Sequence, residues 1–414
     1  MLYPKKFSTS EELFTWLRST EGGNLFVRDE ETSPYAVIYY KKKMSNMKLD
    51  HVLGSRSVVW DKAANKSVFV APAHGKTLTG DVGEFVAEEF VDGVMVNMFY
   101  SPALSSWLLA TRTQLGATNH FYGNRPFSEL FWETFKAVGL TQEDLSTDAT
   151  YSWVLQHPEE RVVVAPPYGI PRLSLVQVSG TVSEKLAALH PTRYTLATLK
   201  NVKEFVTAEG KKRGAQWQGV VLKTPAGERY RLRSTEYNEA RQLRGNQAKR
   251  PFLWLERWSA GRLIAYLRLF PEEQCDADVV VNRFKACTQE LHELYMKVYR
   301  KKELPLGQAP QKYRKLLWDA HKAGKGAYFP ELRKFMNEQD TARKLWLVNY
   351  EVRYATAPAP APAPAPAAVD DNAVDATPAA AVDDSLSATS DDNALSTAPV
   401  ADTVDATPAA DDSL

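Results

Sequence analysis

The sequence predicts an α+β protein that ends in a tail of biased composition. Short alternating or apolar runs separated by turn formers fill residues 1–254 and are typical of antiparallel strands. Residues 255–355 instead show apolar positions at helical spacing, which predicts a second, α-helical domain. From residue 356 to 414 the chain is dominated by Ala, Pro, Asp, Ser, Thr and Val, so this segment is predicted to be disordered.

The first domain is organised around residues 88–100. Asp92-Gly93 predicts a turn, and the alternating residues that follow predict a buried strand. Glycine at the start of a strand lets the backbone approach another group closely. A partner strand is predicted over residues 107–112, so Asp92 is expected near the mouth of a hairpin that ends in Arg112.

Other elements flank this hairpin on both sides. Strand-like segments lie at residues 35–43, 57–60, 67–72, 153–164, 216–222 and 228–233. A helix with one apolar face is predicted over residues 127–135. A second helix, with a polar residue before it and Gly at its end, is predicted over residues 235–246.

Arginines alternate along the last of these strands. Because side chains in a strand repeat every two residues, Arg229, Arg231 and Arg233 are expected on one face. Three neighbouring guanidinium groups repel one another unless they share an anion, and Arg is well shaped for phosphate. A solvated strand with charged side chains is the alternative.

Charge is distributed unevenly along the chain. Residues 356–414 carry eleven Asp and no Lys, Arg or Glu, which leaves 39 acidic against 51 basic residues in the remainder. A basic body is typical of proteins that bind nucleotides or nucleic acids, although solubility alone can produce such a charge. In the helical domain, residues 297–302 and 312–315 are rich in Lys and Arg, so this domain either faces RNA or only supports the first domain.

Several classes of protein are disfavoured. Cys275 and Cys287 have no neighbouring Cys or His, so we expect neither a zinc site nor a disulfide framework. Low cysteine usage favours an intracellular, cytoplasmic setting. No apolar run reaches the ~20 residues of a membrane span, so no membrane partner is expected.

In their order along the chain, these segments resemble the covalent nucleotidyltransferase superfamily. The resemblance is to phage-type RNA ligases and their relatives in large DNA viruses, and it covers residues 24–250. It implies an ATP-grasp-like ligase domain in residues 1–254, with ATP and Mg²⁺ as cofactors and a viral origin. In that family, the lysine of a Lys-x-Asp-Gly motif attacks the α-phosphorus of ATP. Two later carboxylates contact the ribose and a metal, and cations on a late strand neutralise the α-phosphate.

The sequence departs from this family at three positions. Phe90 stands where the family has its nucleophilic lysine, and Val154 and Gln218 stand where it has glutamates. The Asp-Gly half of the first motif is retained. Arg231 and Arg233 occupy the positions of the cationic strand, whereas Arg229 aligns with no family cation and is expected to matter less.

The resemblance implies two groups of binding residues and no catalytic residue. The implied nucleotide-binding residues are Lys76, Asp92, Gly93, Arg112, Gln218, Lys223, Arg231 and Arg233. The implied RNA-binding residues are Arg241, Arg244, Lys249 and Arg250. Lys76 is the nearest lysine before Phe90, so it is also the candidate for a displaced nucleophile.

Two functions remain open at this point. One is a ligase-like protein that binds a nucleotide, RNA or both without forming a lysyl adenylate. The other is an active ATP-dependent RNA ligase, joining a 5′-phosphate to a 3′-hydroxyl, with a relocated nucleophile. The simultaneous departures at positions 90, 154 and 218 favour the first.

Overall fold

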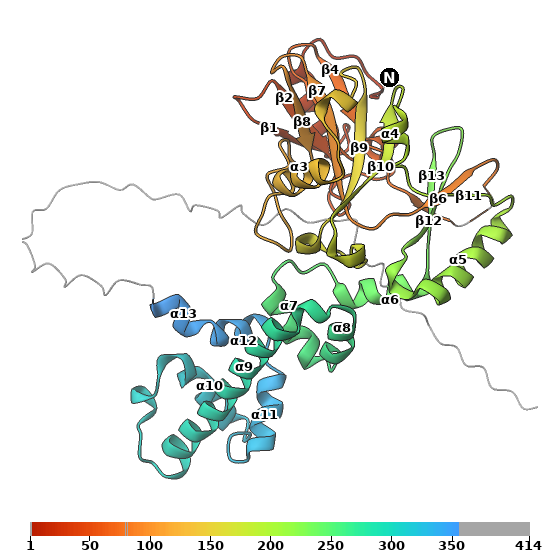
Figure 1. Ribbon diagram of the computed structural model, residues 1–414. Coiled ribbons are helices and arrows are strands. Elements are labelled where there is room, and N and C mark those ends of the chain that lie inside the picture. The colour runs from red at the N-terminus through yellow and green to blue at the C-terminus, as the bar shows by residue number, and fades with distance from the viewer. Residues whose placement is uncertain (1, 79, 81, 356–414) are drawn as a thin grey trace, which may run out of the picture.

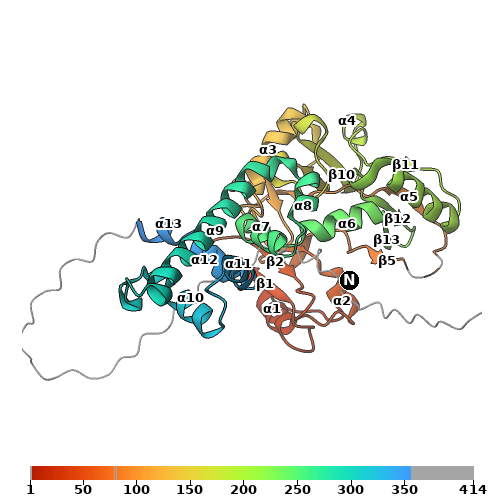
Figure 2. The ribbon, with the colours of Figure 1, turned by 90° about the horizontal axis from the view of Figure 1, so that it is seen from below.

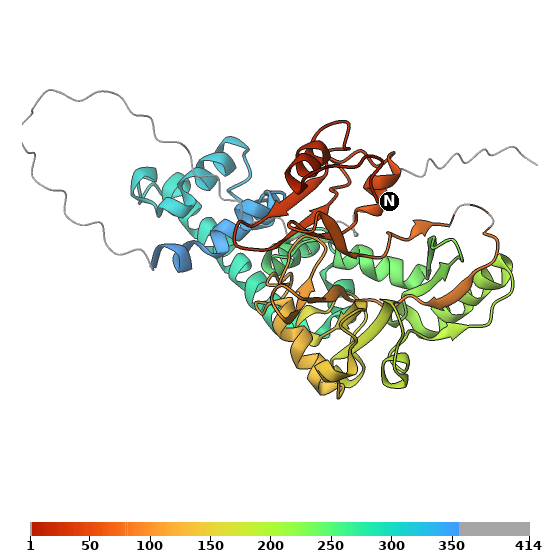
Figure 3. The ribbon, with the colours of Figure 1, turned by 90° about the horizontal axis from the view of Figure 1, so that it is seen from above.

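The computed structural model describes residues 2–78, 80 and 82–355. The tail predicted to be disordered, residues 356–414, lies outside the described residues. Three mainly antiparallel sheets occupy the first part of the chain, and a lobe of helices follows them (Figure 1). The predicted α+β class is therefore confirmed. The views from below and from above both show the lobe projecting from one end of the molecule (Figures 2 and 3).

The N-terminal sheet has the strand order β1-β2-β3-β4 and is antiparallel throughout. Its strands are β1 (Phe26–Asp29), β2 (Tyr35–Tyr39), β3 (Val58–Asp61) and β4 (Lys66–Val70), and its helices are α1 (Ser10–Arg18) and α2 (Asp50–Gly54). Helix α1 buries Leu13, Phe14 and Leu17 against one face of this sheet. The strands predicted at residues 57–60 and 67–72 are confirmed as β3 and β4, which pair with each other.

The central sheet has the strand order β10-β9-β7-β8 and contains the predicted central hairpin. Its strands are β7 (Val94–Ser101), β8 (Ser106–Ala110), β9 (Thr150–Gln156) and β10 (Arg172–Ser179). Helix α3 (Phe127–Ala137) buries Leu130 and Phe131 against Val96 and Met98 of β7. The predicted amphipathic helix and the predicted alternation along β7 are both confirmed.

The third sheet has the strand order β11-β6-β12-β13-β5. Its strands are β5 (Lys76–Thr77), β6 (Val86–Glu89), β11 (Arg193–Tyr194), β12 (Gly219–Lys223) and β13 (Arg229–Arg233). Only the pair of β13 with β5 is parallel among the pairs described. Helix α5 (Leu199–Arg213) packs Val202 and Val206 against Val220 and Leu222 on one face, which leaves the opposite face of β12 and β13 turned toward the central sheet.

The helical lobe follows the third sheet. Its elements are α6 (Thr235–Arg244), α7 (Arg250–Ser259), α8 (Leu263–Leu269), α9 (Gln274–Tyr295), the π-helix η6 (Met296–Arg300), α10 (Gln311–Lys322), α11 (Phe329–Asn337), α12 (Thr341–Val348) and α13 (Tyr350–Ala355). Shorter helical segments are η1 (Gln142–Asp144), η2 (Pro158–Glu160), η3 (Pro167–Gly169), α4 (Glu184–Ala187), η4 (Gly214–Gln216), η5 (Pro271–Glu273) and η7 (Leu306–Gln308). The predicted boundary between residues 254 and 255 falls inside α7. Because Leu253 and Leu255 are both fully buried in apolar clusters of the lobe, all of α7 belongs with the lobe.

A buried arginine of the lobe, Arg244, ties the lobe to the segment that follows β9. Arg244 donates to Glu273 Oε1 at 2.6 Å and to the backbone oxygen of Arg161 at 3.0 Å, and both ionic side chains are almost completely buried. Trp254 and Tyr266 also donate to the Glu273 carboxylate. Within the described residues, no helix combines the length and the apolar character needed to cross a membrane.

Candidate functional site

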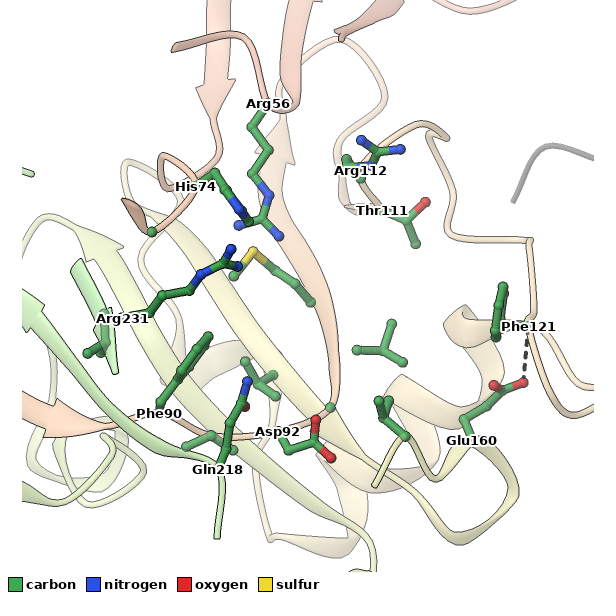
Figure 4. Close-up of a pocket in the computed structure, with 18 of the residues that line it drawn as sticks. Arg56, His74, Phe90, Asp92, Thr111, Arg112, Phe121, Glu160, Gln218 and Arg231 are labelled. Carbon is green, nitrogen blue, oxygen red and sulfur yellow. Dashed lines mark hydrogen bonds between the residues drawn. The ribbon is translucent and has the colours of Figure 1, made fainter. Parts of the chain in front are cut away.

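A cavity of about 220 Å³ lies between the central sheet and the third sheet (Figure 4). One wall comes from β12 and β13, and the opposite wall from the start of β7 and from β9. The segment that joins β6 to β7, residues 90–93, lies between these walls. The cavity therefore collects residues that are far apart in the sequence.

The three arginines of β13 all line this cavity, as their spacing predicts. Tyr230 and Leu232 point to the other side, where they pack against the core under α5. Burial lowers the pKa of Arg229 to about 10, with a smaller contribution from Arg56. Burial also lowers the pKa of Arg233 to about 10, with help from nearby Arg241 and Arg231. Both guanidinium groups stay charged at neutral pH, so their burial and the repulsion from neighbouring arginines cost free energy that a bound anion would offset.

Additional basic side chains approach from the N-terminal sheet and from the end of β8. Figure 4 shows Arg56, His74 and Arg231 pointing toward one another, with Arg112 nearby. Arg112 also donates to the backbone oxygen of Tyr40 at 3.3 Å. The buried Nε atoms of Arg229 and Arg233 have no hydrogen-bond partner among the described residues. This concentration of cations fits an anionic ligand.

The two carboxylates of the cavity are already engaged by donors of the chain. Asp92 Oδ2 accepts from the backbone N–H groups of Val163 and Val164 at 2.9 and 2.8 Å, and Asp92 Oδ1 accepts from the Tyr237 hydroxyl at 2.7 Å. Glu160 accepts from three backbone N–H groups in the loop of residues 121–123, one of which is drawn in Figure 4. Among the described residues, no cluster of three or more His, Cys, Asp or Glu side chains is placed to hold a metal.

Asp92 therefore has a structural role that the sequence did not reveal. We expect Asp92→Ala to lower the free energy of unfolding by about 2–3 kcal/mol, because it leaves buried N–H and O–H donors without an acceptor. Urea denaturation followed by tryptophan fluorescence measures this loss. Tyr237→Phe removes one of the three hydrogen bonds and serves as the partial variant, with a loss of about 1 kcal/mol. A fully stable Asp92→Ala protein would contradict this role.

Gly93 is explained by the neighbouring strand. Its φ is +148°, and a Cβ atom at this position would lie 2.4 Å from the backbone oxygen of Leu155 on β9. The close approach that the sequence predicts is therefore between β9 and the turn that enters β7. Together, Asp92 and Gly93 hold the segment of residues 90–93 in place.

The three positions at which the sequence departs from the ligase pattern meet in this cavity. Phe90, Val154 and Gln218 all line it. The Phe90 ring lies under the Arg233 guanidinium, 5.1 Å from ring centre to Cζ, and the backbone N–H of Phe90 donates to Gly219 O at 2.9 Å. Gln218 is 5% exposed, and its Oε1 has no partner among the described residues. No lysine is among the described residues that line the cavity.

Two lysines assigned to the nucleotide lie elsewhere. Lys76 is on β5 with its side chain 57% exposed, and it donates to Glu228 Oε1 at 2.7 Å. This carboxylate raises the pKa of Lys76, which opposes the deprotonation that a nucleophile needs. Lys223 is paired with Glu88 and donates to Val176 O at 2.9 Å. Neither lysine lines the candidate cavity, whereas His74 and Gly75, which directly precede Lys76, do.

The four residues assigned to RNA do not form one surface. Arg244 is buried in the ion pair with Glu273, so its guanidinium is out of reach of RNA and holds the lobe instead. Arg250 lies 3.6 Å from the same carboxylate. Lys249 is exposed at the start of α7, and Arg241 lies on α6 near Arg233. The assignment to RNA stays a prediction for Arg241 and Lys249.

Sequence reasoning missed residues that only the fold brings to the cavity. They are Arg56, Glu160, Phe121, Tyr122 and Tyr237. Burial raises the pKa of Tyr122 and of Tyr237, so both stay neutral. No local pattern marks these residues, because they come from four separate segments of the chain, with Phe121 and Tyr122 adjacent in one loop.

No protein-family model matches the sequence, and no curated protein matches it. Among solved structures, it is similar to a putative ATP-dependent DNA ligase from Aquifex aeolicus, with 17% identity over 64% of this chain and 72% of that chain and a TM-score of 0.37. It is also similar to an archaeal ATP-dependent RNA ligase in form 2, with 11% identity over 84% and 88% of the two chains and a TM-score of 0.40. Form 1 gives 13% identity over 82% and 87% and a TM-score of 0.35.

Proposed function

We propose that the cavity binds the phosphate of a nucleotide or of an RNA end, and that it does so without forming a lysyl adenylate. The observation that carries this proposal is the row of Arg229, Arg231 and Arg233 facing a cavity whose own carboxylates are already engaged. Guanidinium groups form paired, charge-assisted hydrogen bonds to phosphate oxygens. A phosphate would supply partners for the buried Nε atoms of Arg229 and Arg233.

Aromatic rings beside the arginines favour a nucleotide over inorganic phosphate. The aromatic residues of the lining are Phe90, Phe121, Tyr122, Phe127 and Tyr237. Flat aromatic faces stack on nucleobases whatever the base. Because Phe127 and Tyr237 are almost completely buried, the cavity offers the rings of Phe90, Phe121 and Tyr122 to a base and the arginines to its phosphate.

The described lining of this cavity lacks the reactive amine that the covalent chemistry of ligases requires. A phosphoramidate requires an amine, and Phe90 supplies none. Mg²⁺ also fits poorly, because Asp92 and Glu160 each accept three hydrogen bonds from the chain and have little capacity left for a cation. ATP fits the arginines, whereas a resident metal does not fit the carboxylates. The protein would then be a ligase-like pseudoenzyme.

Incubation with α-labelled ATP and either Mg²⁺ or Mn²⁺, followed by denaturing electrophoresis, tests the absence of covalent chemistry. We expect no label on the protein, since no lysine lines the cavity in the part of the chain that the structure describes. A stable label would instead establish the active ligase with a relocated nucleophile, and peptide mapping would then identify that residue.

Calorimetric titration tests binding itself. We expect heat from ATP and GTP, and much less from adenosine and guanosine, which lack the phosphates. Equal binding of the phosphorylated and unphosphorylated ligands would contradict the phosphate role of the arginines.

A further inference from the structure

A second cationic region lies in the helical lobe, far along the chain from the cavity. Helix α9 and the π-helix η6 end beside the end of α10, because the rings of Tyr299 and His321 stack 3.8 Å apart at an angle of 4°. Tyr295 forms a hydrogen bond with His321 Nδ1 at 3.1 Å. Gly326 lies so close to the Tyr295 ring that a Cβ atom there would be 1.9 Å from it. The two helix ends and the turn after α10 therefore form one packed unit (Figure 1).

This arrangement gathers basic residues from two separate segments of the sequence. We call them the basic end, and they are Lys297, Arg300, Lys301, Lys302, Lys322 and Lys325, all of which are exposed. Among these described side chains, only Lys301 is in an ion pair, with Glu303 at 4.0 Å. Cations near a helix C-terminus stabilise its dipole, but Lys301, Lys302 and Lys325 lie beyond the last helical residues. Stabilisation of the helix dipoles therefore does not account for all of these cations.

Two large aromatic side chains are exposed close in sequence to Lys322 and Lys325. Trp318 is 54% exposed and Tyr328 is 66% exposed. On α10, Lys315, Trp318 and Lys322 are separated by three and four residues, so they follow one face of the helix. An aromatic ring between lysines offers a stacking face for a base and cations for the adjoining phosphates.

We infer that the basic end, together with Trp318 and Tyr328, is a docking surface for single-stranded RNA. Unpaired bases are the partner that uses exposed rings and separated cations together. A membrane-binding helix would surround its tryptophan with aliphatic side chains, whereas Trp318 has Lys315 and Lys322 on the same face. This surface is distinct from the cavity proposed to bind nucleotides, because it would contact the internal nucleotides of an RNA strand and would need no terminal phosphate.

Fluorescence anisotropy with a 3′-labelled oligouridylate that carries a 5′-hydroxyl tests this surface in the full chain. We expect the paired change Lys322→Ala and Lys325→Ala to weaken binding about tenfold at low salt. The slope of log affinity against log salt should become shallower by about 1.4, from two lost phosphate contacts on a single strand. Trp318→Ala should cost about tenfold by itself, and Trp318→Phe should retain most of the affinity.

Matched controls separate this surface from general charge and from the cavity. The pair Lys200→Ala and Lys203→Ala removes two exposed lysines from α5 and should leave binding unchanged. Arg233→Ala should also leave this probe unaffected, although it is expected to weaken nucleotide binding. Equal losses from the α5 pair and from the pair Lys322→Ala and Lys325→Ala would overturn the inference, as would no loss from Trp318→Ala. Binding to phosphatidylserine vesicles without binding to the oligonucleotide would overturn it in favour of a membrane surface.

Discussion

Phe90→Lys is expected to yield a less stable protein that still forms no adenylate. The change removes a ring that lies 5.1 Å from the Arg233 guanidinium and places an ammonium in its position. Loss of the cation–π contact and repulsion between two cations about 5 Å apart together lower the free energy of unfolding by about 2–4 kcal/mol. Because Val154 and Gln218 offer no carboxylate, the new lysine would also lack a metal and a contact to the ribose. Chemical denaturation and labelling with α-labelled ATP measure the two effects.

Two control variants separate charge from shape at this position. Phe90→Met keeps an apolar side chain and should cost about 1–2 kcal/mol, which is less than the lysine variant. Phe90→Tyr keeps the ring and should be close to wild type in stability. Adenylation of Phe90→Lys at the rate of an active ligase would mean that the cavity needs no further carboxylate, and it would contradict our interpretation of Val154 and Gln218.

Local sequence patterns were sufficient to predict the elements that build the cavity. Alternation along β7 and β13 depends only on neighbouring residues, since a strand sends successive side chains to opposite faces. The apolar face of α3 follows from its own spacing in the same way. These patterns alone predict that Arg231 and Arg233 lie on one face of β13.

The roles of some residues depend on hydrogen-bond and ion-pair partners that are distant in the sequence, so local patterns could not predict them. Asp92 is held by Val163 and by Tyr237, which lie 71 and 145 residues away in the sequence. Arg244 is neutralised by Glu273, 29 residues further along. A carboxylate in a turn and an arginine on a polar helix look functional in the sequence, because their partners are visible only in the fold.

The fold also changes what is expected of Arg229, because the sequence alone does not show which residues surround it. It aligns with no cation of the ligase pattern, yet it lines the cavity together with Arg231 and Arg233. Burial lowers its pKa, as it lowers that of Arg233. Arg229 is therefore expected to contribute to anion binding like Arg231 and Arg233, and not to matter less than they do.

Replacing any one of these three arginines by alanine should weaken binding of ATP or of 5′-phosphorylated RNA by about 1–3 kcal/mol, the range for a charge-assisted hydrogen bond. The fold should persist, because a smaller side chain at these sites relieves repulsion among half-buried cations. Lysine at the same positions restores charge but not the planar pair of donors, so it should recover only part of the affinity. Calorimetric titration of each variant measures these differences.

Arg28→Ala provides the matched control, because Arg28 is also on a strand, β1, but is largely exposed and pairs with Glu30 at 3.7 Å. It should leave nucleotide affinity unchanged. For RNA, the slope of log affinity against log salt should become shallower by about 0.7 for each phosphate contact that is lost from a single strand. If all three cavity variants matched Arg28→Ala, the arginine row would be only a charged strand face. The cost of burying Arg229 and Arg233 would then need an explanation other than an anion.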